Sequence, residues 1–215
     1  MYENILFDLD GTVTESAPGI FQSIRYAMDR MNVPLPDSLD MSVFIGPPLT
    51  VSFRSILGLS ESDADRAVSF YREYYGDRGL FECRVYPGVP ELLTRLRAEG
   101  RTVALATAKP ETFSRRILDH FGLTDRFTFI GGASLDASRR TKDAVIAHVL
   151  PQLPGAFAEN TIMVGDRDQD VTGARNNGIG CIGVLYGYGS AEELAGAGAL
   201  ALAEDCDELY LRLCE

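Results

Sequence analysis

The sequence predicts an α/β protein whose core is a doubly wound, Rossmann-like parallel sheet. Three observations predict this class. Short apolar runs end at polar residues or glycines such as Asp8, Thr107 and Gly165, as buried parallel strands do. Helical patterns separate most of these runs, and such alternation is typical of a parallel sheet. A long, mainly helical insertion follows the first run and predicts a second, smaller domain.

Five apolar runs are expected to form the strands, at residues 5–7, 103–106, 127–130, 162–164 and 179–185. Each is short and continuously apolar, as expected of a strand that helices cover on both faces. Helices are expected over 89–96 and 113–121, because apolar residues share one face and Gly100 and Gly122 provide C-terminal stops.

The insertion between the first and second runs is far longer than one crossover helix needs. Apolar residues recur at helical spacing from Ala17 to Met31, and residues 62–76 form another candidate helix with a cluster of tyrosines. We expect those tyrosines to pack inside the insertion. The predicted organisation is a catalytic core of residues 1–15 and 83–215 with a helical cap of residues 16–82.

Composition excludes several classes of protein. The formal net charge of −11 over 215 residues disfavours binding to a nucleic acid polymer. None of the four cysteines forms a Cys-x-x-Cys pair, so we expect reduced thiols. No run approaches the roughly 18–20 apolar residues of a membrane span, and no signal-peptide pattern opens the chain. We expect a cytoplasmic monomer or homodimer that acts on a small molecule, without membrane or nucleic acid partners.

The first candidate site is Asp8-Leu9-Asp10-Gly11-Thr12, directly after the first strand. Side chains two residues apart in extended geometry point to the same side, so the Asp8 and Asp10 carboxylates are expected to lie close together. A divalent cation relieves the repulsion between such carboxylates. The simpler interpretation is an acidic turn after a strand, which is common.

A second acidic cluster, Gly165-Asp166-Arg167-Asp168-Gln169-Asp170, follows another strand. Because the carboxyl ends of parallel strands meet at one edge, Asp166 is expected to approach Asp8 and to supply an oxygen ligand to the cation. Asp170 could orient a ligand or a lysine from outside the first ring of ligands. The simpler interpretation is helix N-capping by Asp166 or Asp168, which explains one aspartate and not three.

Thr107 and Lys142 are candidate partners for a phosphate. Thr107 ends a strand just before a helix, where hydroxyl and amide donors favour an anion, although it could also be a simple N-cap. Lys142 enters a helix around Val145, where a lysine is usually solvated. A cation near the aspartates would nevertheless be needed to neutralise a phosphoryl group. His120 and His148 are interpreted as structural.

These elements, in this order, resemble the haloacid dehalogenase-like hydrolase superfamily, subfamily I. Asp8 to Thr12 looks like its first motif, Thr107 its second, Lys142 its third, and Gly165-Asp166 with Asp170 its fourth. The helical insertion is similar to a type 1 cap. The resemblance covers essentially the whole chain.

The resemblance implies a Mg²⁺-dependent phosphatase with a covalent aspartyl-phosphate intermediate. Asp8 would be the nucleophile and Asp10 the general acid and base. Asp8, Asp166 and the backbone carbonyl of Asp10 would hold Mg²⁺. The phosphoryl group would contact Thr107, Ala108 and Lys142, with Ala108 lacking the side-chain donor that many relatives carry as Ser or Asn.

Within the superfamily, Phe44-Ile45-Gly46-Pro47-Pro48-Leu49 looks like the phosphoglycolate phosphatase branch, and a group of bacterial 5′-nucleotidases is also similar. This makes Gly46 and Pro47 candidates for setting specificity. A sugar-phosphate mutase with the same intermediate and a non-catalytic binding protein on the same fold remain alternatives. A dehalogenase needs no metal, and the second carboxylate Asp10 argues against it.

Overall fold

The computed structural model describes residues 1–136 and 138–215. It contains two compact units, one made of residues 1–15 and 85–215 and the other of residues 16–84. The second unit therefore runs two residues beyond the predicted end of the insertion at residue 82. Two short strands, β2 (Thr14–Glu15) and β3 (Arg84–Val85), pair where the chain passes between the units.

The first unit contains a six-stranded sheet in the order β5-β4-β1-β6-β7-β8. All neighbouring pairs are parallel, which confirms the predicted doubly wound α/β class. The chain moves outward from β1 in one direction and then in the other, so β1 lies at the switch point where ligands bind in such sheets. The strands are β1 (Asn4–Phe7), β4 (Thr102–Pro110), β5 (Phe129–Ala133), β6 (Thr161–Gly165), β7 (Gly180–Val184) and β8 (Ala201–Ala203).

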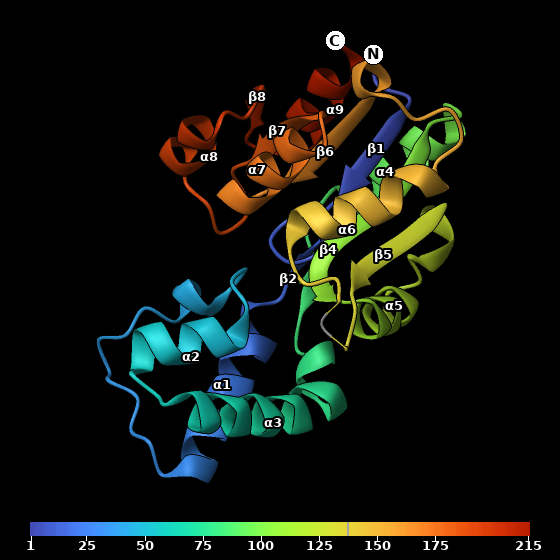
Figure 1. Ribbon diagram of the computed structural model, residues 1–215. Helices are drawn as coiled ribbons and strands as arrows, with labels where there is room; N and C mark the ends of the chain where they lie inside the picture. The colour runs from blue at the N-terminus through green and yellow to red at the C-terminus, as the bar shows by residue number, and fades with distance from the viewer. Residues whose placement is uncertain (137) are drawn as a thin grey trace. The chain divides into compact units, whose positions relative to one another are not determined.

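Helices cover both faces of this sheet (Figure 1). One face carries α6 (Lys142–Val149), α7 (Asp168–Asn176) and α8 (Ala191–Ala197), and the other carries α4 (Val89–Ala98), α5 (Glu111–His120) and α9 (Cys206–Cys214). Val145, Val149 and Val171 from the first set pack on Leu6 and Met163 of the sheet. Full burial of each such side chain stabilises the fold by about 1.5–3 kcal/mol.

Strand β5 lies further along the chain than predicted. It covers Phe129–Ala133 instead of 127–130, and it includes Gly131 and Gly132, which follow the predicted run. A Cβ on Gly131 would lie 2.4 Å from Val149 of α6, and one on Gly132 would lie 2.7 Å from the backbone of Glu111 of α5. The glycines therefore belong to the strand because helices pack closely on both of its faces there. Strand β8, in an Ala/Gly-rich stretch, was not predicted.

The second unit is helical, with α1 (Ala17–Met31), α2 (Leu49–Leu57) and α3 (Glu61–Asp77). Single 3-10 turns cover Met41–Phe44 and Gly79–Phe81. Tyr71 and Tyr75 of α3 are buried and stack with ring centroids 5.1 Å apart, so these tyrosines pack inside the unit as expected. Helix α2 was not separately predicted, because four prolines interrupt the pattern around it.

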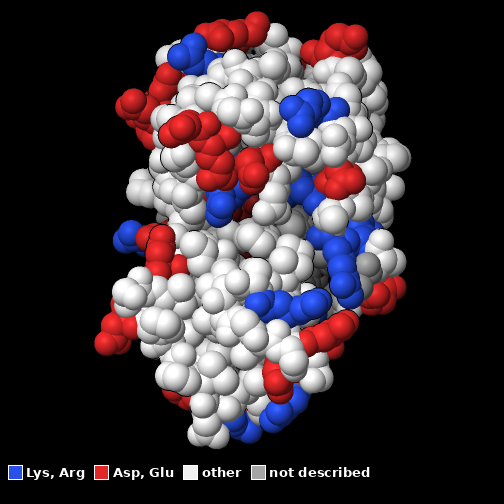
Figure 2. Space-filling view, turned by 60° about the vertical axis from the view of Figure 1, so that its left-hand side comes forward, with Lys and Arg blue, Asp and Glu red and all other residues white. Residues whose placement is uncertain are grey.

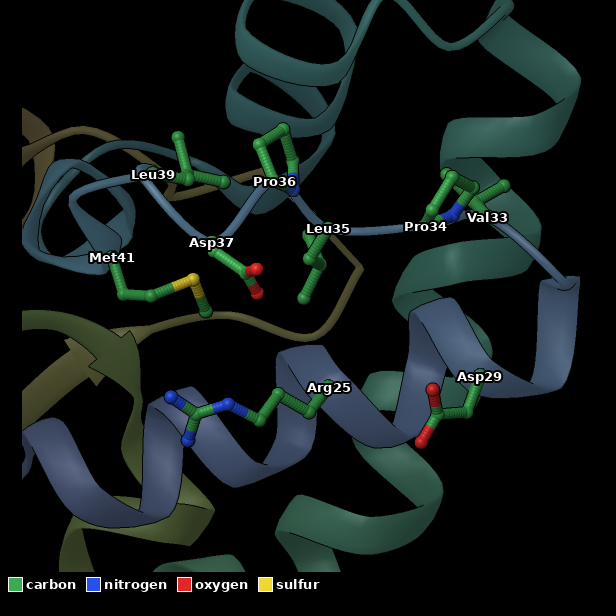
Figure 3. Close-up of a pocket in the computed structure, with 9 residues that line it drawn as sticks. All are labelled: Arg25, Asp29, Val33, Pro34, Leu35, Pro36, Asp37, Leu39 and Met41. Atoms are coloured by element: carbon green, nitrogen blue, oxygen red, sulfur yellow. The ribbon is translucent and has the colours of Figure 1, made fainter.

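A cavity of about 350 Å³ lies within the helical unit, between α1 and the segment that follows it (Figure 3). Arg25 and Asp29 project from α1, and Asp37 and Met41 come from the segment after it. No residue of the predicted site lines this cavity.

Acidic and basic side chains are interspersed on the face drawn in Figure 2. Among residues 1–136 and 138–215, no helix has both the length and the apolar character needed to cross a membrane.

Candidate active site

The candidate residues of the first unit converge at the carboxyl ends of three adjacent strands. In the sheet register, Phe7 pairs with Leu105 on one side and with Val164 on the other. Asp8 therefore follows the central strand and Asp166 follows one neighbour, while Thr107 lies in the other neighbour, two residues beyond the Leu105 that pairs with Phe7. The order of strands brings together residues that lie more than 150 positions apart in the chain.

Lys142 bridges two of the carboxylates. Its Nζ lies 2.6 Å from Asp8 Oδ1 and 2.7 Å from Asp170 Oδ1, and it donates to the Ala106 carbonyl at 3.1 Å. Lys142 is 5% exposed, so it is not the solvated residue of the simpler interpretation. Burial alone would lower the pKa of this ammonium group, but Asp170 and Asp8 outweigh burial and raise it above its ordinary value. Lys142 is therefore a fixed positive charge beside Asp8.

Asp166 is fully buried, and its neighbours fix both of its carboxylate oxygens. The Thr12 hydroxyl donates to Oδ1 at 3.2 Å, and the Tyr188 backbone N–H donates to Oδ2 at 2.8 Å. Gly11 has a φ of +83°, and a Cβ there would lie 2.1 Å from Asp166 Oδ2. Glycine at position 11 thus allows the loop after β1 to turn closely over the Asp166 carboxylate.

Asp170 stabilises the start of α7 in addition to holding Lys142. Its Oδ2 accepts the Arg167 backbone N–H at 3.1 Å, while Oδ1 faces Lys142. The predicted N-caps Asp166 and Asp168 do not take this role, because Arg167 occupies the cap position. Asp170 has partners on both oxygens, which suits a residue that orients Lys142.

Thr107 lies inside β4 and is not the N-cap of α5, a position that Pro110 occupies. Its hydroxyl is buried and accepts the Lys109 backbone N–H at 3.2 Å. Ala108 follows it and is partly exposed. The segment therefore presents Thr107 next to Ala106, the residue whose carbonyl binds Lys142.

Sequence reasoning missed Lys109 as a site residue. Its Nζ lies 2.7 Å from Asp10 Oδ2, and the Lys109 side chain is 5% exposed. Two signals in the sequence could have identified it. Lys109 is two positions from Thr107, and regular alternation along a strand would place both side chains on one side. It is also one of only two lysines in the chain, and the other is Lys142.

The charges in this cluster fit a divalent cation. Asp8, Asp166 and Asp170 each offer a carboxylate oxygen, and these atoms lie within 4.8 Å of one another. With Asp10, the site has four carboxylates against two ammonium groups, Lys109 and Lys142, which leaves a formal charge of −2. The donors are all oxygens, as a hard cation such as Mg²⁺ prefers.

The candidate specificity residues Gly46 and Pro47 lie in the helical unit, after the Met41–Phe44 turn. Gly46 is exposed and Pro47 is partly exposed. The remaining predicted residues, Asp8, Asp10, Thr107, Ala108, Lys142, Asp166 and Asp170, all belong to the first unit.

The buried aspartates predict an unusual dependence of stability on pH. Burial raises the pKa of Asp170 to about 6, against the opposing effect of Lys142, and burial and Asp170 also raise the pKa of Asp166. The native chain thus holds these protons more tightly than the unfolded chain, so their contribution to stability is lost as pH rises. With a chelator present, we expect Asp170 to lower the free energy of unfolding by on the order of 2 kcal/mol between pH 4 and 6.

Urea unfolding followed by circular dichroism at pH 4, 5, 6 and 7 measures this slope. Other groups titrate in the same range, so the test compares the wild type with Asp170→Asn. The variant is expected to lose less stability across the window. Equal slopes for the two proteins would contradict the assignment.

The chain resembles known proteins along most of its length. A family model described as haloacid dehalogenase-like hydrolase matches residues 5–184. A 5′-nucleotidase of Pseudomonas aeruginosa is 45% identical over 90% of this chain and 87% of its own length. The tyrosine-protein kinase PtkA of Mycobacterium tuberculosis is 43% identical over 87% of this chain, which spans 64% of that relative's length.

The fold of the chain is also shared with a solved structure. A predicted phosphatase from Clostridium acetobutylicum superposes with a TM-score of 0.94 at 41% identity, covering 100% of this chain and 99% of that one. The family match spans the first strand, the helical unit and the sheet as far as β7. The family resemblance predicted from the motifs is confirmed: the chain belongs to the haloacid dehalogenase-like hydrolase family.

Proposed function

We propose that this hydrolase is a Mg²⁺-dependent phosphatase that removes phosphate from small monoesters through an aspartyl-phosphate on Asp8. The observation that carries the proposal is the contact between Asp8 and Lys142, which are 2.6 Å apart in a site where further carboxylates surround them. A buried ammonium group keeps a carboxylate nucleophile from repelling an anionic substrate. The P. aeruginosa relative named 5′-nucleotidase supports the phosphatase assignment.

The proposed reaction has two steps. In the first, an Asp8 oxygen attacks phosphorus, the bond from phosphorus to the leaving oxygen breaks, and Asp10 gives that oxygen a proton. In the second, Asp10 takes a proton from water as the water oxygen attacks phosphorus, and the bond to Asp8 breaks. Inorganic phosphate leaves, and both aspartates return to their starting protonation states.

The other residues bind and orient. Thr107, the Ala108 backbone and Lys142 contact the phosphoryl oxygens, and Asp170 holds Lys142 in place. The Asp8 and Asp166 carboxylates and the Asp10 carbonyl would hold Mg²⁺, which would supply charge neutralisation at the phosphoryl group when bound. We assign selection of the leaving group to the helical cap, with Gly46 and Pro47 as the candidate residues.

A phosphate-release screen tests the proposed function. Phosphoglycolate, nucleoside 5′-monophosphates and sugar phosphates are incubated with the protein in Mg²⁺ or in excess chelator. We expect release from at least one of the first two classes, with a loss of about 100-fold or more in chelator, because the excess charge of the site is then uncompensated. Release that chelator leaves unchanged would contradict the metal assignment. Transfer of phosphate between sugars without release would indicate a mutase.

A further inference from the structure

The chain uses lysine at two positions only. Of its 20 basic residues, 18 are arginines, and the two lysines are Lys109 and Lys142. Both are buried, and each has its ammonium group within 2.7 Å of an aspartate of the Asp8-Leu9-Asp10 sequence. Lysine is a compact point charge, whereas arginine presents a wide planar fork, so the two lysines occupy places where a small cation fits.

The backbone around Lys109 is unusual and fixes the position of the side chain. Strand β4 continues to Pro110, but its register with β5 shifts between Thr107 and Pro110. Such an irregularity bends a strand and redirects a side chain. The Thr107 hydroxyl accepts the Lys109 N–H at 3.2 Å, and a Cβ on Gly132 of β5 would lie 2.7 Å from the Lys109 carbonyl. The hydrogen bond and the close approach of Gly132 therefore limit the room that the Lys109 backbone has.

The Asp10 carboxylate is held mainly by this lysine. Its Oδ2 is 2.7 Å from Lys109 Nζ, and its Oδ1 is buried without a hydrogen-bond partner among residues 1–136 and 138–215. A carboxylate with one strong contact and a free second oxygen takes its orientation from that contact. The Lys109 ammonium group is therefore the contact that sets how the Asp10 carboxylate lies.

We propose that Lys109 is a positioning residue that orients Asp10 for proton transfer, a role that rests on the proposed phosphatase function. It does so through Asp10 and not by contact with the phosphoryl group. The two lysines thus have different roles. Lys142 pairs with Asp8, the nucleophile, and Lys109 pairs with Asp10, the general acid and base.

A double-mutant cycle separates the two roles that Lys109 could have. The proteins are wild type, Lys109→Met, Asp10→Asn and the double variant, with Mg²⁺ present. On phosphoglycolate, whose alkyl leaving group needs a proton, we expect Lys109→Met to lower kcat by about 10- to 100-fold. In the Asp10→Asn background the same change should cost less than about 2-fold, because residues that act as a unit are non-additive. Equal losses in both backgrounds would show direct contact with the phosphoryl group and overturn the proposal.

Comparing substrates with different leaving groups distinguishes a role in proton transfer from a merely structural role. A structural role would lower the rates on both substrates equally. p-Nitrophenyl phosphate has a leaving group that departs readily without a proton. We therefore expect the fold-loss in kcat that Lys109→Met causes on this ester to be smaller, by a factor of about 5 or more, than the fold-loss it causes on phosphoglycolate. Lys109→Arg, which keeps the charge, should recover part of the loss. Arg126→Met removes an exposed cation elsewhere on the same unit and should leave both rates unchanged.

A crystal structure of Lys109→Met tests the proposal without any turnover. We expect the Asp10 carboxylate to leave its wild-type orientation while Asp8, still paired with Lys142, keeps its own. An unmoved Asp10 would overturn the positioning role even if the protein proves to be an active phosphatase. A moved Asp10 in a protein that hydrolyses no phosphate ester would support the positioning role and refute the proposed function instead.

Discussion

Asp8→Asn is expected to lower phosphate release by about 10⁴-fold or more, the largest effect of any single substitution in the chain. An amide cannot form the covalent bond to phosphorus at a useful rate, and the neighbouring carboxylates Asp10 and Asp170 already have partners. Asp10 is turned toward Lys109, and both Asp170 oxygens are engaged. Steady-state assays on the best substrate of the screen measure the loss.

Asp168→Asn is the matched control for this variant. Asp168 lies in the same acidic cluster but is exposed, and its backbone N–H binds Glu193. The control should retain full activity, and Asp8→Asn should unfold at a temperature near that of the wild type because Lys142 keeps Asp170 as a partner. A rate for Asp8→Asn within 10-fold of the wild type would refute the nucleophile assignment.

Lys142→Met is expected to have the largest effect on stability. The change leaves Asp8 and Asp170 buried together without their cation, and breaking a buried ion pair in this way costs about 3–5 kcal/mol. Urea unfolding at pH 7 in chelator should reveal the full loss. The loss should shrink at pH 5, because burial raises the pKa of Asp170 to about 6 and its protonation removes one of the unpaired charges. Mg²⁺ should also reduce it.

The rate of phosphate release by Lys142→Met should fall at pH 7, as its free energy of unfolding does. Lys142→Arg retains the charge but places a wider head group where Nζ now fits between two carboxylates and a carbonyl. We expect it to be more stable than Lys142→Met and still impaired in turnover. Arg140→Met, which removes an exposed cation two residues away, is the control. A Lys142→Met protein as stable as the wild type would show that the ion pairs contribute nothing to the fold.

The positions of the core aspartates could be predicted because one rule governs them. Asp8 and Asp166 each follow an apolar run, and parallel strands bring such ends to one edge of the sheet. The same rule located Thr107. It could not predict that the Thr107 hydroxyl accepts the Lys109 N–H, because this bond lies in an irregular stretch of β4, where the register with β5 shifts.

The cations of the site were harder to predict than its carboxylates. The partners of Lys142 depend on where α6 begins and on how that helix packs against α7, and neither is visible in a local pattern. Lys109 was not predicted as a site residue at all. The scarcity of lysine in this chain was the available signal. Strand β5 was also misplaced, since Gly131 and Gly132 follow the predicted run of residues 127–130 but belong to the strand and allow close packing of α5 and α6.

The most direct test of the account is detection of the phosphoryl group on Asp8. The protein is mixed with substrate and Mg²⁺, quenched in acid during turnover, digested at low pH and analysed by mass spectrometry. We predict a peptide containing residues 8–10 that carries one phosphoryl group at Asp8 and is absent from Asp8→Asn. Rapid phosphate release with no phosphoryl group on Asp8, or with one on another residue, would contradict the central claim.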